Sequence, residues 1–191
     1  NIGKKRLNFL KKKEVVATVD PYNKDADYIK IDKIDIKSYD SVILSCPDKD
    51  KFYYLKKFLA LKKNVLVEKP LIFKNSKNLK EIFDKFKKKK LILYVAYNHR
   101  FEPHFVRAKK IIDSKILGKI YSCRLFYGNG TALLVKKSPW RDQSLGVVSD
   151  LGSHLLDTCN YWFGFKKLKI NKSLLLNFEN KSFDHAKVLF H

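Results

Sequence analysis

The sequence contains no methionine, only three cysteines and no long apolar run. Because no apolar stretch matches the thickness of a bilayer and no signal-peptide pattern is present, we predict no membrane partner. The three thiols, Cys46, Cys123 and Cys159, have no spacing typical of a metal or redox site. We therefore expect reduced cysteines in a soluble, cytoplasmic protein, and no metal site.

Neither end of the chain has the pattern of a complete protein. The chain begins at Asn1 instead of an initiator methionine, and residues 186–191 have the pattern of an unfinished strand. These features predict a piece of a longer protein. With 191 residues and 45% hydrophobic content, this piece has enough material for one good core or two smaller ones.

Acidic residues and arginine are both scarce. Lysine and arginine number 41 against 19 acidic residues, for a formal net charge of +22. Only five of the 41 are arginine, whereas a protein that binds nucleic acid would be expected to use the forked guanidinium more often. We interpret the charge as a composition bias and predict no nucleic-acid partner. The alternative is a basic polyanion-binding module, whose binding would weaken steeply with salt.

Short apolar runs alternate with amphipathic segments in the first half of the chain. The apolar runs predict buried strands at 41–47, 64–67 and 91–95, and the one-sided apolar faces predict helices at 48–62 and 76–88. This alternation predicts an α/β fold with a doubly wound parallel sheet.

The first twenty residues resemble part of a nucleotide-binding unit. A helix is expected beside Gly3, and the apolar strand 14–20 ends in Asp20, 17 positions after that glycine. This order is typical of the latter half of a dinucleotide-binding βαβ unit. Gly3 would be the last glycine of G-x-G-x-x-G, and Asp20 would accept hydrogen bonds from the adenosine ribose. The alternative is that residues 20–23 form an ordinary turn.

The pattern changes after residue 96. This change predicts two domains, 1–96 and 97–191, the second an α+β domain with an incomplete sheet. The elements expected in the second domain are a helix at 104–114, a strand at 120–127, a polar loop at 128–145, a helix at 149–163 that stops at Gly164, and strands at 168–178 and 186–191.

The strand at 64–67 leads directly into Glu68, Lys69 and Pro70. Ligands of open α/β sheets bind at the carboxyl ends of the strands, and the proline keeps Lys69 out of the helical region. A partly desolvated lysine at this edge is suited to proton or hydroxyl chemistry. The alternative is that Glu68 and Lys69 only solvate the end of the strand.

A second polar group lies on the predicted helix 149–163. Asp150, His154, Asp157 and Tyr161 are spaced i, i+4, i+7 and i+11, so they share one face. A carboxylate one turn before an imidazole can orient it for acid/base catalysis. The alternatives are a solvated polar face and half of a metal site, although no third ligand has a convincing position.

Three motifs in this order resemble the Gfo/Idh/MocA family of NAD(P)-dependent oxidoreductases. Glu-Lys-Pro alone also occurs in glucose-6-phosphate dehydrogenases, whereas its combination with D-x-x-x-H after a glycine-bearing loop is specific. The motifs are Glu68-Lys69-Pro70, then Tyr97-Asn98-His99-Arg100-Phe101-Glu102-Pro103, and then residues 146–157 with Asp150 and His154.

The resemblance implies a Rossmann domain followed by an α+β domain with an open, mainly antiparallel sheet. It implies NAD as cofactor, with NADP possible, a small sugar-like substrate and a homo-oligomer at full length. Asp20 favours NAD because its charge would repel a 2′-phosphate. Carried over by motif, the catalytic residues are Lys69, Asp150 and His154, the cofactor-binding residues are Gly3, Asp20, Pro47 and Glu68, and the substrate-binding residues are Asn98, Arg100, Trp140 and Arg141.

The implied reaction transfers a hydride between nicotinamide and a secondary hydroxyl of a sugar, sugar nucleotide or inositol. His154, oriented by Asp150, would take the hydroxyl proton, and Lys69 would hold the oxygen. Family members commonly have asparagine and histidine shortly after the proline that stands here at position 47, whereas this chain has Asp48 and Lys51. The alternative function is a non-catalytic member that binds a nucleotide or sugar as a sensor or assembly subunit.

Overall fold

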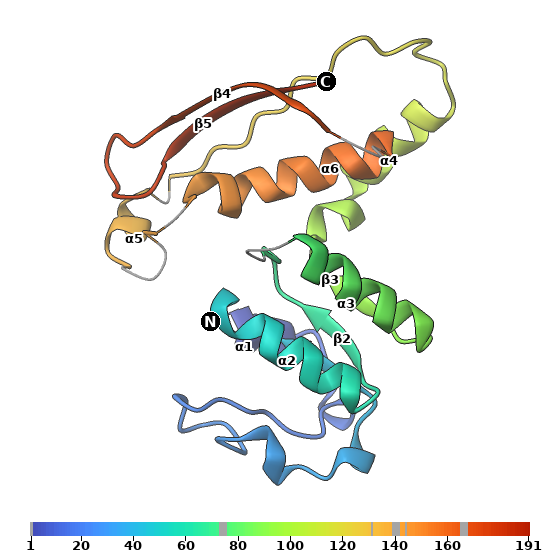
Figure 1. Cartoon of the computed structure of the whole chain (residues 1–191), viewed down its shortest axis with the longest axis vertical. Coiled ribbons are helices and arrows are strands. Elements are labelled where there is room, and N and C mark those ends of the chain that lie inside the picture. The colour runs from blue at the N-terminus through green and yellow to red at the C-terminus, as the bar shows by residue number, and fades with distance from the viewer. Residues whose placement is uncertain (1, 73–75, 131, 139–141, 144, 165–167) are drawn as a thin grey trace. The chain divides into compact units, whose positions relative to one another are not determined.

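The computed structural model describes residues 2–72, 76–130, 132–138, 142–143, 145–164 and 168–191. The chain forms two compact units, Asn1–Ala96 and Tyr97–His191 (Figure 1). No helix within these described ranges is both long enough and apolar enough to span a bilayer.

A parallel sheet lies at the centre of the first unit. Its strands are β1 (Ser41–Leu44), β2 (Asn64–Val67) and β3 (Leu93–Val95), paired in the order β1-β2-β3. The connections contain the helices α2 (Asp48–Ala60) and α3 (Ser76–Lys88). The predicted alternation of strand and helix is therefore confirmed, as is the parallel sheet.

The core of this unit forms where α2 and α3 pack on the sheet. Both helices present apolar side chains at three- and four-residue spacing, and β2 contributes alternate valines. Complete burial of one such side chain contributes about 1.5–3 kcal/mol. The buried residues are Leu44, Leu55, Phe58, Leu59, Val65, Val67, Ile82 and Phe86.

The segment before the sheet differs from the prediction. Helix α1 (Ile2–Leu7) forms as expected, but the strand predicted at 14–20 is wrong, because only a single bridge joins Val19 to Tyr28. The Asp27 carboxylate accepts hydrogen bonds from the backbone N–H and the hydroxyl of Thr18, at 2.7 Å each. A side chain therefore occupies a donor that a strand ladder would need. The rest of the segment includes three short 3-10 helices, Lys12–Glu14, Ile31–Lys33 and Ile36–Ser38.

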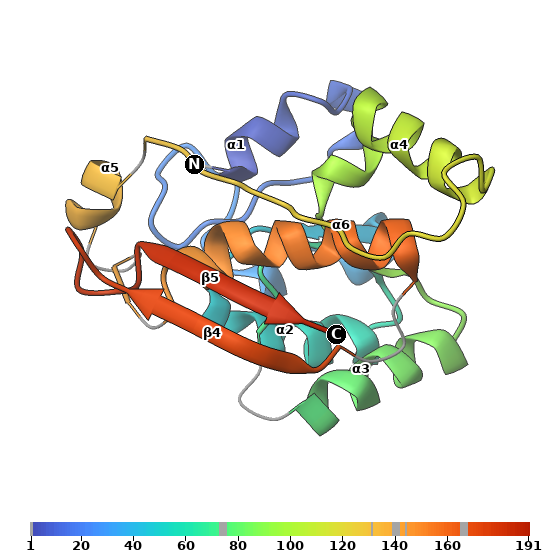
Figure 2. The same ribbon diagram turned by 90° about the horizontal axis from the view of Figure 1, so that it is seen from above.

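Helices and an antiparallel hairpin make up the second unit. The hairpin of β4 (Ile170–Leu176) and β5 (His185–Phe190) lies along α6 (Ser153–Phe163), and α4 (Pro103–Asp113) packs on α6 (Figures 1 and 2). Helix α6 ends at Gly164 in the left-handed conformation, as predicted. A short 3-10 helix, η4 (Asn98–Phe101), precedes α4.

Three predictions for this unit need correction. Residues 120–127 form no strand, since they pair with no neighbour and their Tyr121 and Phe126 are 87% and 93% exposed. The predicted polar loop contains a short helix, α5 (Ala132–Lys136). The predicted helix 149–163 begins as a π-helical turn, η5 (Val148–Gly152), before it continues as α6. Such π turns occur frequently at functional sites.

Candidate active site

The carboxyl ends of the parallel strands bring several predicted site residues to one edge of the first unit. Hydrogen bonds from Glu68 N to Leu44 O (3.0 Å) and from Ala96 N to Val67 O (2.8 Å) extend the ladder to this edge. Pro47 follows β1, and Glu68 and Lys69 follow β2. This is the edge at which α/β sheets bind ligands.

Glu68 is buried at this edge, with 7% of its surface exposed. Its carboxylate accepts a 2.5 Å hydrogen bond from the guanidinium Nε of Arg6 in α1. A buried carboxylate needs such a partner, so this contact ties α1, with Gly3 in its first turn, to the end of β2. The sequence analysis missed Arg6. A signal that could have pointed to Arg6 is the scarcity of arginine, which makes up five of the 41 basic residues.

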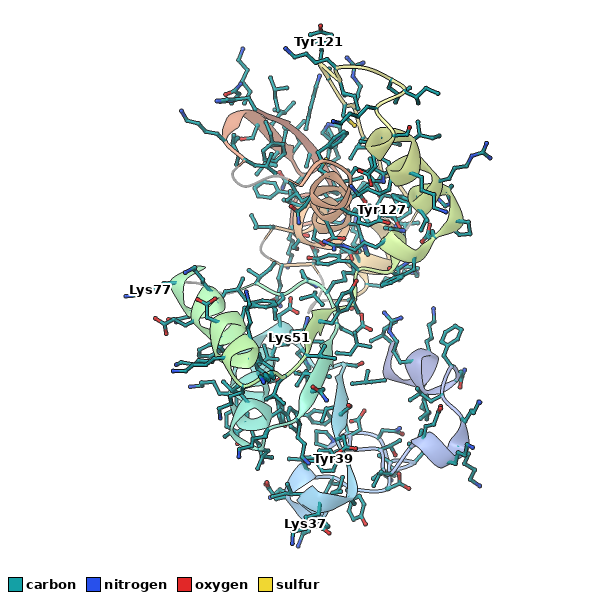
Figure 3. The ribbon with its side chains drawn as sticks, turned by 90° about the vertical axis from the view of Figure 1, so that its right-hand side faces the viewer. Lys37, Tyr39, Lys51, Lys77, Tyr121 and Tyr127 are labelled. Atoms are coloured by element: carbon teal, nitrogen blue, oxygen red, sulfur yellow. The ribbon has the colours of Figure 1, made fainter. Side chains whose placement is uncertain are left out.

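Lys51 supports the turn that carries Lys69. This α2 side chain is 2% exposed, and its ammonium group donates to the Pro70 carbonyl at 2.7 Å and lies 2.6 Å from the Asp48 carboxylate (Figure 3). The ammonium therefore fixes the backbone immediately after Lys69. Lys51 and Asp48 are two of the positions at which this chain differs from the family pattern.

Asp20 lies in a turn, which agrees with the alternative that the sequence left open. Its carboxylate accepts a 2.9 Å hydrogen bond from the backbone N–H of Tyr22. Because an ionised carboxylate has about four acceptor sites, this single bond is compatible with further bonds to ribose hydroxyls. The Asp20 carboxylate therefore retains acceptor sites suited to ribose hydroxyls, and its cofactor-binding role stays a prediction.

The π turn and α6 position Asp150 and His154 in the second unit. His154 is 7% exposed and the Asp157 side chain 9% exposed, so the stripe is not a solvated polar face. Across the described ranges, no group of three or more His, Cys, Asp or Glu could hold a metal ion. The burial of these side chains argues against the solvated-face alternative, and the acid/base role of the stripe stays a prediction.

Aromatic rings surround the imidazole of His154. The ring of His99 lies 4.5 Å away between centroids, that of Tyr97 5.7 Å away and that of Tyr127, labelled in Figure 3, 6.1 Å away. Burial raises the pKa of the Tyr97 hydroxyl above its usual value, an effect partly opposed by a hydrogen bond with Ser153. These rings shield the imidazole from water.

Two predicted substrate-binding residues have partners within the second unit. Arg100 donates from Nε and from its terminal nitrogen to both carboxylate oxygens of Asp157, at 2.7 and 2.5 Å, which joins η4 to α6. The Asn98 amide donates to the Glu102 carboxylate at 3.1 Å. These contacts position η4 beside His154. The other two, Trp140 and Arg141, lie outside the described residues.

The sequence analysis assigned no role to His99 or Glu102. Nδ1 of His99 lies 2.6 Å from the Glu102 carboxylate, and His104 lies 3.4 Å from the same group. The signal that could have found the first pair is its i, i+3 spacing inside the motif that begins at Tyr97.

The turn between β4 and β5 holds the backbone that leads into η5. Val147 N donates to Phe183 O at 2.7 Å, and the Asp142 carboxylate accepts from Ser182 N at 2.7 Å. The backbone N–H of Ser182 is the main cause that lowers the pKa of Asp142. Gly146 lies in this contact with a positive φ of 48°.

Comparisons with known proteins agree with this arrangement. Residues 2–97 match the oxidoreductase-family NAD-binding Rossmann fold, and residues 105–188 match the GFO/IDH/MocA C-terminal domain. An uncharacterized oxidoreductase of Schizosaccharomyces pombe is 33% identical over 141 residues, which cover 72% of this chain and 37% of that protein.

Two further relatives have named substrates. The levoglucosan dehydrogenase of Pseudarthrobacter phenanthrenivorans is 31% identical over 107 residues, or 53% of this chain and 27% of that enzyme. A solved levoglucosan dehydrogenase in complex with NADH and levoglucosan superposes with a TM-score of 0.62 at 25% identity, covering 73% of this chain and 38% of that one. The matched part of this chain thus spans well under half of each relative.

Both units are now accounted for by the two domains of a single family. The unit with the parallel sheet matches the NAD-binding domain, and the unit with the antiparallel hairpin matches the C-terminal domain. The chain belongs to the Gfo/Idh/MocA family of oxidoreductases.

Proposed function

We propose that this chain is part of an NAD-dependent dehydrogenase that oxidises a secondary hydroxyl of a sugar or polyol. The observation that carries the proposal is the burial of His154 among aromatic rings, one turn after Asp150, within the family's D-x-x-x-H motif. An imidazole is the side chain most often used to take up a proton near neutral pH, and a carboxylate four residues earlier is suited to orient it.

The proposed roles follow from the chemistry of each side chain. His154 accepts the proton of the substrate hydroxyl at a ring nitrogen, and Asp150 orients the ring and stabilises the imidazolium that forms. Lys69, in the family's Glu-Lys-Pro motif, is suited to stabilise the negative charge that develops on a substrate oxygen. NAD⁺, when bound, supplies the hydride acceptor. Arg6 and Lys51 position the sheet edge through Glu68 and the Pro70 carbonyl.

One observation supports the proposed class of cofactor, and another supports the proposed class of substrate. Asp20 is an acceptor suited to ribose hydroxyls and would repel a 2′-phosphate, which favours NAD over NADP. The levoglucosan dehydrogenases to which the chain is similar act on an anhydro-sugar, which supports a sugar or polyol as substrate.

The test is a spectrophotometric assay of protein made from the complete reading frame. We expect absorbance at 340 nm to rise when NAD⁺ is offered with a member of a panel that contains levoglucosan, inositols and hexoses. Binding of NADH, measured by its fluorescence, without turnover of any panel member would favour the non-catalytic sensor instead. Lys24→Ala, a change at an exposed lysine, is the control for surface effects.

A further inference from the structure

Tyr22 presents an aromatic ring to solvent two positions after Asp20. The residue is 95% exposed, and the proposed mechanism does not use its side chain. A single exposed apolar side chain is common on protein surfaces and needs no explanation by itself. What distinguishes this ring is its place beside Asp20, the residue predicted to bind the adenosine ribose.

One tight turn carries both side chains. The Asp20 carboxylate accepts a 2.9 Å hydrogen bond from the backbone N–H of Tyr22. Such a bond from an aspartate to the backbone two residues later defines an Asx turn, and Pro21 between them has a fixed φ. The turn therefore holds the carboxylate close to the point at which the Tyr22 side chain begins.

The loop that presents Tyr22 is closed at its base by hydrogen bonds. Asp20 N donates to Tyr28 O at 3.0 Å, and Tyr28 N donates to Thr18 O at 3.1 Å. The Asp27 carboxylate adds two contacts of 2.7 Å, to the backbone N–H and the hydroxyl of Thr18. A ligand that binds at this loop has little backbone to order, so more of its contact energy remains as affinity.

An ion pair joins the same loop to helix α1. The ammonium of Lys4, the residue after Gly3, lies 3.3 Å from the Asp25 carboxylate. The loop therefore lies beside two residues predicted to bind cofactor, Gly3 in α1 and Asp20 in the loop itself. In a dinucleotide the adenosine ribose carries the phosphates at one end and the base at the other. A ribose held at Asp20 would thus bring its base within reach of the Tyr22 ring.

We propose, on the basis of the dehydrogenase function above, that Tyr22 binds the adenine of the cofactor by stacking its ring on the base. An exposed aromatic face beside a ribose-binding carboxylate suits this role, because every nucleobase has a flat π-face that can stack on such a ring. The contact needs the ring of Tyr22 and not its hydroxyl. Tyr22 contributes to cofactor affinity and takes no part in the chemical step.

Titration with adenosine monophosphate tests this contact without turnover. The protein is made from the complete reading frame, calorimetry gives the affinity, and proton NMR reports the upfield shift that a stacked ring imposes on the base protons. Tyr22→Ala should weaken binding by about 5–150-fold and remove the upfield shift. Tyr22→Phe should retain both. The matched control is Tyr53→Ala, a change at a 60% exposed tyrosine of α2, which should bind the nucleotide as the unaltered protein does.

Two further measurements separate stacking from a structural role. The urea midpoint should be the same in Tyr22→Ala and the unaltered protein, because so exposed a side chain contributes little to stability. In active enzyme, the KM for NAD⁺ should rise in Tyr22→Ala while kcat changes little, since a contact with the base is made equally before and during hydride transfer.

Three results would overturn the proposal. They are equal nucleotide affinity in Tyr22→Ala and the unaltered protein, a loss in Tyr22→Phe as large as that in Tyr22→Ala, and no binding of adenosine monophosphate by the unaltered protein. Turnover of NAD⁺ by an enzyme whose nucleotide affinity does not depend on Tyr22 would refute the stacking alone. Nucleotide binding that depends on Tyr22, without turnover of any sugar or polyol, would refute the dehydrogenase function and leave the stacking intact.

Discussion

Substitution of Gly146 by alanine is the sharpest test of the backbone that leads into the candidate site. A Cβ atom at this position would lie 2.1 Å from Phe183 O and 2.8 Å from Ser182 Oγ, and the backbone φ of 48° is one that alanine adopts at a cost. The neighbouring hydrogen bond from Val147 N to Phe183 O, at 2.7 Å, cannot survive if the two segments move apart.

The expected loss of stability is the sum of a conformational and a packing contribution. The left-handed conformation costs alanine about 1–2 kcal/mol. The clash with a carbonyl oxygen adds about 1–3 kcal/mol of packing strain, or the loss of a hydrogen bond worth about 1 kcal/mol. We therefore expect Gly146→Ala to lower the free energy of unfolding by about 2–5 kcal/mol, a large part of the stability of a typical domain.

Urea denaturation followed by circular dichroism measures this loss, and the chain provides a matched control. Gly164 has a similar φ of 65°, but a Cβ there would meet nothing within 4 Å among the residues that the structure describes. Gly164→Ala should therefore cost only the conformational part, about 1–2 kcal/mol. Equal losses in the two variants would refute the close approach of Gly146 to the β4–β5 turn.

Three further predictions concern the supports of the site. Lys51→Met should lower the free energy of unfolding in urea by about 1–3 kcal/mol, because the Pro70 carbonyl loses its buried donor; an unchanged midpoint would contradict this contact. Arg100→Lys should lower the free energy of unfolding by about 1–3 kcal/mol in the same assay, because a lysine cannot bind both carboxylate oxygens of Asp157 as the guanidinium does. An unchanged free energy of unfolding would show that the two-point contact is not needed. Burial raises the pKa of the Cys46 thiol to about 11, so iodoacetamide should alkylate this thiol about 100-fold more slowly at pH 8 than a free thiol. The alkylation rate should rise about tenfold with each pH unit towards 11. Alkylation at the rate of a free thiol would contradict the burial of Cys46.

Local patterns were sufficient to predict the parts of the fold that depend on neighbours in sequence. The run 64–67 has the β-branched residues and proline stop of a buried parallel strand, and 76–88 has a continuous apolar face, so both elements appear where expected. Lys69 was found from its place at a strand end and His154 from its spacing to Asp150, and their assignment as catalytic residues followed from the resemblance to a family.

Long-range partners decided the parts that the sequence did not predict. Residues 14–20 and 120–127 have apolar residues but find no ladder, and strand formation depends on a neighbour as much as on propensity. The Arg6 contact with Glu68 joins residues 62 positions apart, which no local pattern encodes. The pair of His99 and His154 likewise depends on the packing of η4 against α6.

The central claim is that Lys69 and His154 carry out chemistry and not merely binding. Turnover of a polyol with NAD⁺ should be measured at 340 nm in Lys69→Ala, His154→Gln and the control Lys24→Ala, together with NADH affinity by fluorescence. The account predicts that kcat falls by about 10²–10⁴-fold in the first two variants while NADH affinity hardly changes. Undiminished kcat in either variant would contradict it.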